Sequence, residues 1–134
     1  MIAKNEVANY NNSMTFTIVG ETPSKKNSRI LNTKTKRSFP NQNYVRWHGS
    51  AVTQIRLQKV PPVPIGKRVE ITFTFYHGDL KRRDSDNQTA SVLDTLTDAG
   101  ILPDDNWKVV PEKHIYDRYD KGNARCEIKI EEID

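Results

Sequence analysis

Two aspartates, Asp84 and Asp86, stand one residue apart and follow directly after the cations Lys81, Arg82 and Arg83. On an extended backbone, side chains at i and i+2 point to the same side, so these carboxylates repel each other unless a cation lies between them. Mg²⁺ suits that position because it binds through one or two carboxylates and takes its other ligands from water and phosphate oxygens. The neighbouring cations are suited to holding a phosphodiester backbone. The segment therefore indicates metal-assisted phosphodiester hydrolysis.

A second acidic pair, Asp104 and Asp105, follows 18 residues after Asp86 and extends the same chemistry. A structural interpretation of all four residues has equal weight at this point. In that interpretation Asp86 is the N-cap of a helix, Asp84 is a loop residue and Asp104-Asp105 is a turn. One D-x-D spacing is too common to decide between a metal site and these structural roles.

A calcium-binding EF-hand loop beginning at Asp84 is excluded. Such a loop needs an acid or Asn, then Gly, then Glu at three positions where this chain has Gln88, Thr89 and Thr95. The expected cofactor is therefore Mg²⁺, with Mn²⁺ able to substitute for it.

Hydrophobic patterns predict the elements that must position these acids. Period-two alternation predicts four strands, and apolar residues at helical spacing predict two helices. The expected strands are 14–20, 68–76, 107–115 and 124–133, and the expected helices are 43–59 and 87–99. This β-α-β-α-β-β order predicts an α+β fold, a small single domain over residues 14–134 with a mixed sheet of about four strands covered by two helices. Residues 1–13 are expected to form a flexible N-terminus.

Charge is distributed unevenly along the chain. The net charge is +4, but residues 1–67 carry 11 Lys and Arg against two acids, whereas residues 68–134 carry an excess of five acids. No acid occurs between Thr22 and Val69. Uncompensated positive charge of this extent favours a polyanion such as nucleic acid over a merely solvated basic face. The candidate contacts to DNA are Lys25, Lys26, Arg29, Lys81, Arg82 and Arg83.

Composition excludes several classes of protein. The chain has 134 residues, of which 35% are hydrophobic, and no apolar run approaches the roughly 20 residues of a membrane helix. The N-terminus has no apolar core of the signal-peptide type. The single cysteine, Cys126, cannot form an internal disulfide. We therefore expect a soluble, cytoplasmic, single-domain protein with no membrane partner.

The acidic segments also resemble a known family, the RusA-type Holliday-junction resolvases. The resemblance rests on Arg83-Asp84-Ser85-Asp86-Asn87, then Leu93-Asp94-Thr95-Leu96, then Ala99-Gly100 and a loop ending in Asp104-Asp105. The family signature is R-D-x-D-N at the start of a helix that closes on L-x-x-A-G, followed by D-D. The order and the spacing both match, and an early basic loop at 23–27 is similar too. The resemblance covers roughly residues 14–131.

This resemblance implies a homodimeric, Mg²⁺-dependent endonuclease that cuts four-way DNA junctions by paired nicks in recombination and repair. It places Asp84, Asp86 and Asp105 at the family's essential carboxylates, with Asp104 beside them as a further metal ligand. One position departs from the pattern. Family members commonly carry a Lys four residues after the second Asp, where this chain has Ala90.

Two further hypotheses remain beside the resolvase. The first is a degenerate resolvase, a non-catalytic module that binds junctions or other nucleic acids without cutting them, and Ala90 is the residue that supports it. The second is an RNA-directed metal nuclease, because the sequence does not distinguish an RNA enzyme from a DNA enzyme. Four carboxylates facing DNA without a metal would repel phosphate, which favours the catalytic hypothesis over the binding module.

Chain geometry bears on how the acids meet. A helix from Asp86 to Ala99 rises about 20 Å. The five steps from Gly100 to Asp105 recover at most about 17 Å when fully extended. Asp105 therefore barely returns to Asp86 in one chain, and we expect active sites shared between the subunits of a dimer.

The remaining chemistry-bearing residues are given structural roles. His48, His77 and His114 have no ligand spacing, and Trp47 and Trp107 are expected to pack in the core or at an interface.

Overall fold

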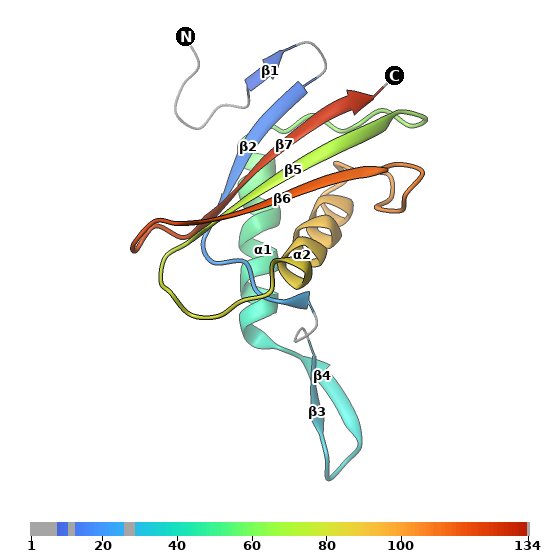
Figure 1. Ribbon diagram of the computed structural model, residues 1–134. Coiled ribbons are helices and arrows are strands. Elements are labelled where there is room, and N and C mark those ends of the chain that lie inside the picture. Colours follow the sequence, from blue (N-terminus) through green and yellow to red (C-terminus); the bar gives the residue numbers. More distant parts are fainter. Residues whose placement is uncertain (1–7, 11–12, 26–28, 134) are drawn as a thin grey trace.

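The computed structural model describes residues 8–10, 13–25 and 29–133 (Figure 1). Its main sheet has five strands in the order β1-β2-β7-β5-β6, and two helices cover one face of that sheet. The main-sheet strands are β1 (Ala8–Tyr10), β2 (Ser13–Val19), β5 (Arg68–His77), β6 (Glu112–Tyr119) and β7 (Arg125–Ile133). The helices are α1 (Gln42–Leu57) and α2 (Ser85–Asp98). A separate hairpin consists of β3 (Arg29–Asn32) and β4 (Arg37–Pro40).

The sheet is mixed, and its one parallel pair determines where α2 lies. β7 pairs antiparallel with β2 on one side and with β5 on the other, whereas β6 pairs parallel with β5. Parallel neighbours need a crossover connection, and α2 is that connection. The segment that leads from β5 into α2 and the segment that leads from α2 to β6 therefore lie at opposite ends of the helix.

The hydrophobic core lies between the sheet and the two helices. Alternate residues of each central strand face the helices, as a sheet with one covered face requires. On β5, Val69, Ile71, Phe73 and Phe75 are all buried. They pack with Ala51 and Ile55 of α1 and with Val92 and Leu96 of α2 in one cluster. This core fixes both helices against the sheet and so fixes the start of α2.

The predicted α+β class, with two helices on a mixed sheet, is confirmed. The strand predicted at 107–115 was placed too early, since β6 runs from Glu112 to Tyr119. The reason is a turn around Asn106. Its carbonyl accepts hydrogen bonds from the backbone N–H groups of Val109 and Val110, and its side chain accepts one from Lys108 N at 2.9 Å. Pro111 then separates the turn from the strand.

Two pieces of the fold lie in segments for which no element was predicted. Ala8–Tyr10, inside the expected flexible N-terminus, pairs with β2 as β1. The β3–β4 hairpin lies between the expected strand 14–20 and the expected helix 43–59, where no element was predicted. Its two short strands lack the alternation of apolar residues that identifies a half-buried strand. No helix in the described part of the chain is long and apolar enough to cross a membrane.

Candidate active site

Asp84 occupies the N-cap of α2, with the extended backbone angles φ −105° and ψ 108° that this position requires. Its carbonyl accepts the first helical hydrogen bonds, from the N–H groups of Asn87 and Gln88. The helix therefore begins at Ser85, before the predicted residue 87, and the prediction of Asp86 as N-cap was wrong. Asp86 lies in the first turn. The two carboxylates are thus presented by a helix start, not by two residues of an extended strand.

Neither the Asp84 nor the Asp86 carboxylate has a partner in the part of the chain that the structure describes. An N-cap Asp usually accepts a hydrogen bond from the N–H of the second or third helical residue, yet the Asp84 side chain makes no such bond. Among the described residues, neither Asp84 nor Asp86 forms a side-chain hydrogen bond or an ion pair. Their oxygens are hard donors of the kind that Mg²⁺ prefers. The positive end of the helix dipole at this point also favours phosphate.

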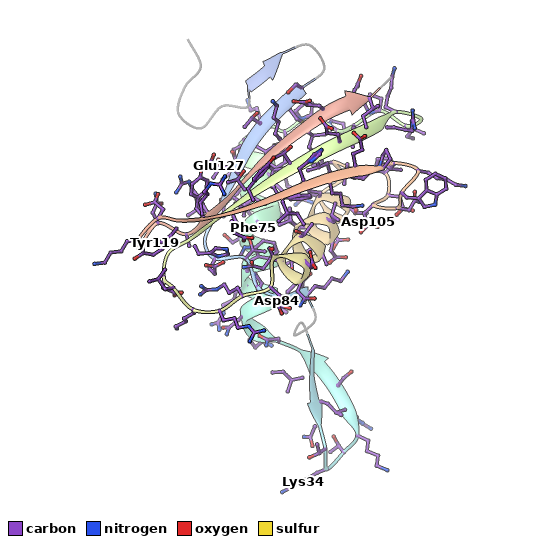
Figure 2. All side chains as sticks on the ribbon, viewed as in Figure 1. Lys34, Phe75, Asp84, Asp105, Tyr119 and Glu127 are labelled. Atoms are coloured by element: carbon purple, nitrogen blue, oxygen red, sulfur yellow. The ribbon has the colours of Figure 1, made fainter. Side chains whose placement is uncertain are left out.

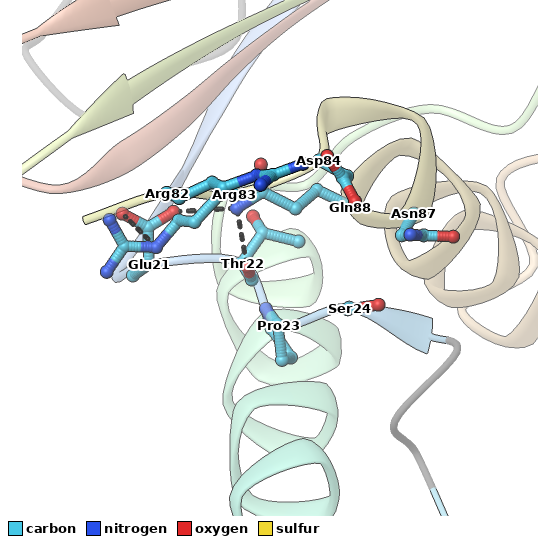
Figure 3. A pocket seen from close by; sticks show the side chains of 9 residues that line it. All are labelled: Glu21, Thr22, Pro23, Ser24, Arg82, Arg83, Asp84, Asn87 and Gln88. Atoms are coloured by element: carbon cyan, nitrogen blue, oxygen red, sulfur yellow. Dashed lines mark hydrogen bonds and ion pairs between the residues drawn. The ribbon is translucent and has the colours of Figure 1, made fainter. Parts of the chain in front are cut away.

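A pocket of about 590 Å³ adjoins Asp84 (Figure 3). It is formed where the segment after β2 meets the segment before α2 and the first turn of the helix. Its lining residues are Glu21, Thr22, Pro23, Ser24, Arg82, Arg83, Asp84, Asn87 and Gln88. The walls are polar and carry both signs of charge, which suits a charged, hydrogen-bonding ligand better than an apolar one.

Glu21 holds the pocket together. Its carboxylate accepts a hydrogen bond from Gln88 Nε2 at 2.8 Å (Figure 3). The same carboxylate lies 3.1 Å from Nδ1 of His77. Nε of Arg83 lies 3.4 Å from its other oxygen. Glu21 therefore connects the end of β2 to β5 and α2. Glu21 was not among the predicted site residues, although its position as the one acid between Glu6 and Glu70 was a signal.

Three polar atoms in the pocket walls have no hydrogen-bond partner among the described residues. They are Oγ1 of Thr22, Oγ of Ser24 and Oε1 of Gln88. Gln88 does use its amide nitrogen, which donates to the carbonyl of Thr22 at 2.8 Å. Buried polar groups are nearly always paired, by protein, water or ligand. These atoms accordingly mark the pocket as a place where a polar ligand or water completes the hydrogen bonding.

Arg83 is anchored within the protein. Nη1 donates to Oδ1 of Asp79 at 2.6 Å and Nη2 donates to Oδ2 at 3.2 Å. The hydrogen bond from Arg83 lowers the pKa of Asp79 to about 2, helped by a backbone hydrogen bond from Lys81. Together with the contact to Glu21, this pair fixes the segment that leads from β5 to Asp84.

The second acidic pair divides into two roles. Oδ1 of Asp104 accepts a hydrogen bond from Asp105 N at 2.7 Å, and Oδ2 accepts one from Asn106 Nδ2 at 3.0 Å. The Asp104 carboxylate thus stabilises its own turn. The carboxylate of Asp105 makes no hydrogen bond or ion pair with any described residue, as is also true of Asp84 and Asp86.

The two acidic pairs do not meet within one chain. Figure 2 shows Asp84 and Asp105 near opposite ends of α2. The 14 residues of this helix span about 20 Å. Among the described residues, no three of the four predicted aspartates bring carboxylate oxygens within 4.8 Å of one another.

Two other groups of side chains do bring three potential metal ligands that close together. One is His48 with Asp94 and Asp98, and the other is Glu70 with Glu112 and His114. In the first group Asp94 already accepts hydrogen bonds from Lys25 Nζ at 3.0 Å and from the Tyr44 hydroxyl at 2.9 Å. Neither group could be predicted from the sequence, because its members do not have the spacing of a metal-binding motif and are brought together by tertiary contacts between helices or strands.

The residues predicted to contact DNA differ in whether their side chains are ion-paired within the protein. Lys81 and Arg82 are exposed, and Arg82 lines the pocket. Lys25 pairs with Asp94, and Arg83 pairs with Asp79 and Glu21. Lys26 lies outside the described residues, as does the side chain of Arg29. Of the two tryptophans, Trp47 is buried as expected, whereas Trp107 is 72% exposed and is not part of the core.

The fold and the site together define a class: a small α+β domain that presents exposed carboxylates and cations at the start of a crossover helix. The chain belongs to the RusA endodeoxyribonuclease family, whose model matches residues 20–131. A similar protein is the crossover junction endodeoxyribonuclease RusA of Aquifex aeolicus (strain VF5). It is 25% identical over 108 residues, which cover 81% of this chain and 83% of that protein. The family resemblance found in the sequence is thereby confirmed.

Proposed function

We propose that this chain is a Mg²⁺-dependent endonuclease that resolves four-way DNA junctions by paired nicks. The observation that carries the proposal is the pair of carboxylates at the start of α2, Asp84 and Asp86, which have no side-chain partner among the described residues. Asp84 also lines a polar pocket there. Membership of the RusA family supports the same reaction class.

Asp84 and Asp86 would hold the metal, and Mn²⁺ would be accepted in its place. When bound, Mg²⁺ supplies a Lewis acid that activates water and stabilises the charge developing on the phosphate. The protein's own contribution is positional. Arg83 and Glu21 fix the segment that carries Asp84, while Lys81 and Arg82 bind the phosphate backbone next to it.

Asp105 would complete the site from the second subunit of a homodimer. Its free carboxylate matches those of Asp84 and Asp86, and its position at the far end of α2 favours a partner's site over its own. Asp104 would support it by holding the turn. Two such shared sites related by two-fold symmetry suit a junction in which two strands are cut symmetrically.

The test is incubation with a synthetic four-way DNA junction, a linear duplex, a single strand and an RNA junction, each with Mg²⁺, Mn²⁺ or EDTA. We expect metal-dependent, symmetric nicking of the DNA junction. Asp84→Asn should abolish nicking, whereas Asp98→Asn at the other end of the same helix should retain it. Preferred cleavage of the RNA junction would instead assign an RNA nuclease.

A binding module that does not cut is the second candidate, and the observation that favours it is Ala90. This residue lies one helical turn after Asp86, where the family commonly has a Lys. Tight junction binding with no cleavage in either metal would establish the binding module and overturn the enzyme.

A further inference from the structure

The β3–β4 hairpin projects from the body of the protein (Figure 1). Each strand has four residues, and residues 33–36 form the turn between them. Residues 30–38 are exposed without exception, and Figure 2 places Lys34 at the tip. An isolated two-stranded hairpin is only marginally stable in water, so a hairpin this exposed is best explained by a surface that it binds.

The turn of the hairpin has a defined conformation. Oδ1 of Asn32 accepts hydrogen bonds from the backbone N–H of Lys34 at 3.0 Å and of Thr35 at 3.2 Å. Lys36 has a left-handed backbone with φ 56°. An Asn side chain that caps the following N–H groups is a strong local turn signal. The cations at the tip are thus presented by an ordered turn.

The charge on the hairpin is entirely positive. Lys34, Lys36 and Arg37 are exposed and form no ion pair with any described residue. The nearest acids in sequence are Glu21 before the hairpin and Glu70 after it. Unpaired cations without intervening acids call for a polyanionic partner.

The hairpin emerges beside the candidate active site. Pro23 and Ser24, which line the pocket next to Asp84, precede β3, and α1 begins at Gln42 directly after β4 and its N-cap. A DNA strand with a phosphate at Asp84 would therefore pass close to the base of the hairpin.

We propose that the β3–β4 hairpin is a DNA-binding arm, whose Lys34, Lys36 and Arg37 contact phosphates of the DNA outside the pocket. The inference rests on the proposed function for the identity of the polyanion. A second copy of this chain is the less favoured occupant. Ile30 and Leu31 are exposed, but the like charges of two approaching tips would repel each other.

The test compares two variants of equal net charge. The arm variant carries Lys34→Gln, Lys36→Gln and Arg37→Gln. The control variant carries Lys59→Gln, Lys67→Gln and Lys121→Gln, all exposed residues of the body, and Lys59 has the same left-handed backbone (φ 55°) as Lys36. Binding of a four-way DNA junction is measured in EDTA by fluorescence anisotropy, between about 50 and 200 mM salt.

We expect the arm variant to lose about two to three units from the slope of log Kd against log salt, since each phosphate contact contributes about 0.9. Its Kd should rise about tenfold or more, whereas the control variant should stay within about threefold of the wild type. Equal behaviour of the two variants would overturn the arm. Unchanged DNA binding with loss of a wild-type dimer, measured by sedimentation, would assign the hairpin to the partner subunit and also overturn it.

These outcomes separate the arm from the proposed function. Wild-type protein that binds junctions through the arm but cuts none in Mg²⁺ or Mn²⁺ overturns only the proposed nuclease. Wild-type protein that cuts junctions while the arm variant binds as tightly as the control overturns only the arm. Wild-type protein that binds no DNA overturns both.

Discussion

Nε2 of His77, the last residue of β5, lies 2.8 Å from Oδ1 of Asp117 on the neighbouring strand β6. On its other side the imidazole lies 3.1 Å from the carboxylate of Glu21. Partial burial lowers the pKa of His77, but the hydrogen bonds to Asp117 and Glu21 outweigh it, so the pKa is raised overall. The ring links the segment after β2 to β5 and β6 next to the pocket.

This raised pKa predicts that stability falls as the solution becomes alkaline. A His whose pKa is higher in the folded state binds its proton more tightly there. The stabilisation is fully present below the unfolded pKa, about 6.5, and is lost as the pH rises through the folded value. The midpoint of urea unfolding should therefore decline above about pH 6.5. His77→Gln should flatten this decline and His114→Gln should preserve it; equal slopes in all three proteins would contradict the assignment.

Arg82 and Arg83 are neighbours with different roles, and matched substitutions should separate them. Arg83→Gln removes the contacts to Asp79 and Glu21, so we expect a loss of up to about 1 kcal/mol in the free energy of unfolding. Cleavage should fall as well, because the segment that positions Asp84 loosens. Arg82→Gln should leave stability unchanged and lower the salt slope of DNA binding by about one unit. Urea unfolding and anisotropy on the same preparations measure both effects. Identical profiles would show that the ion pairs of Arg83 have no positioning role.

Asp104 and Asp105 should also differ, despite being adjacent. Asp105→Asn removes a free carboxylate and is expected to abolish nicking. Asp104→Asn retains an oxygen that can accept the Asp105 N–H, so the turn persists and most activity should remain. The measurement is the single-turnover rate at which each variant nicks a labelled junction. Equal loss in both variants would assign Asp104 to the metal as well.

Heterodimers test whether the active sites are shared. Asp84→Asn and Asp105→Asn subunits are given different affinity tags, co-expressed and purified as mixed dimers. In a shared arrangement one site collects both substitutions and the other has none. The mixed dimer should then nick one strand of a junction without the paired second nick. Complete inactivity would mean that each site draws its carboxylates from one chain.

Ala90 offers a gain of function. A Lys placed there lies one turn after Asp86 on α2 and can reach the phosphate beside it. We expect Ala90→Lys to raise the single-turnover cleavage rate about tenfold or more, since one well-placed donor has an effect of at least that size. Thr97→Lys adds the same charge near the other end of α2 and should leave the rate unchanged. A similar change in cleavage rate in both variants would show that the added positive charge, and not its position beside Asp86, causes the effect.

The central strands could be predicted from the sequence because buried apolar residues alternate with polar ones along them. On β5 the buried residues are Val69, Ile71, Phe73 and Phe75, and the last strand, β7, has the same alternation. The start of β6 was mispredicted, since there the side chain of Asn106 stabilises a turn ahead of Pro111. Propensity does not reveal such a turn, because one side-chain hydrogen bond decides it.

Only those residues of the candidate site that form a pattern with their neighbours in the sequence could be predicted. Asp84, Asp86 and Asp105 stood out by their positions, whereas Glu21 and Gln88 did not. Their contact joins residues 67 positions apart in the chain. Nothing in the neighbourhood of either residue encodes that contact, which exists because β2 and α2 pack on one core. The ion pair of Arg83 with Glu21 was concealed for the same reason.

The β3–β4 hairpin contributes no described residue to the hydrophobic core. Lengthening, shortening or recharging its tip therefore changes little in the folding free energy of the domain. As the proposed DNA-binding arm, this one projection would let an evolving lineage alter the shape of DNA that it accepts while the carboxylates at α2 stay untouched. Selection would then act separately on target choice and on cutting chemistry, and the hairpin would be the place to graft a new binding preference by design.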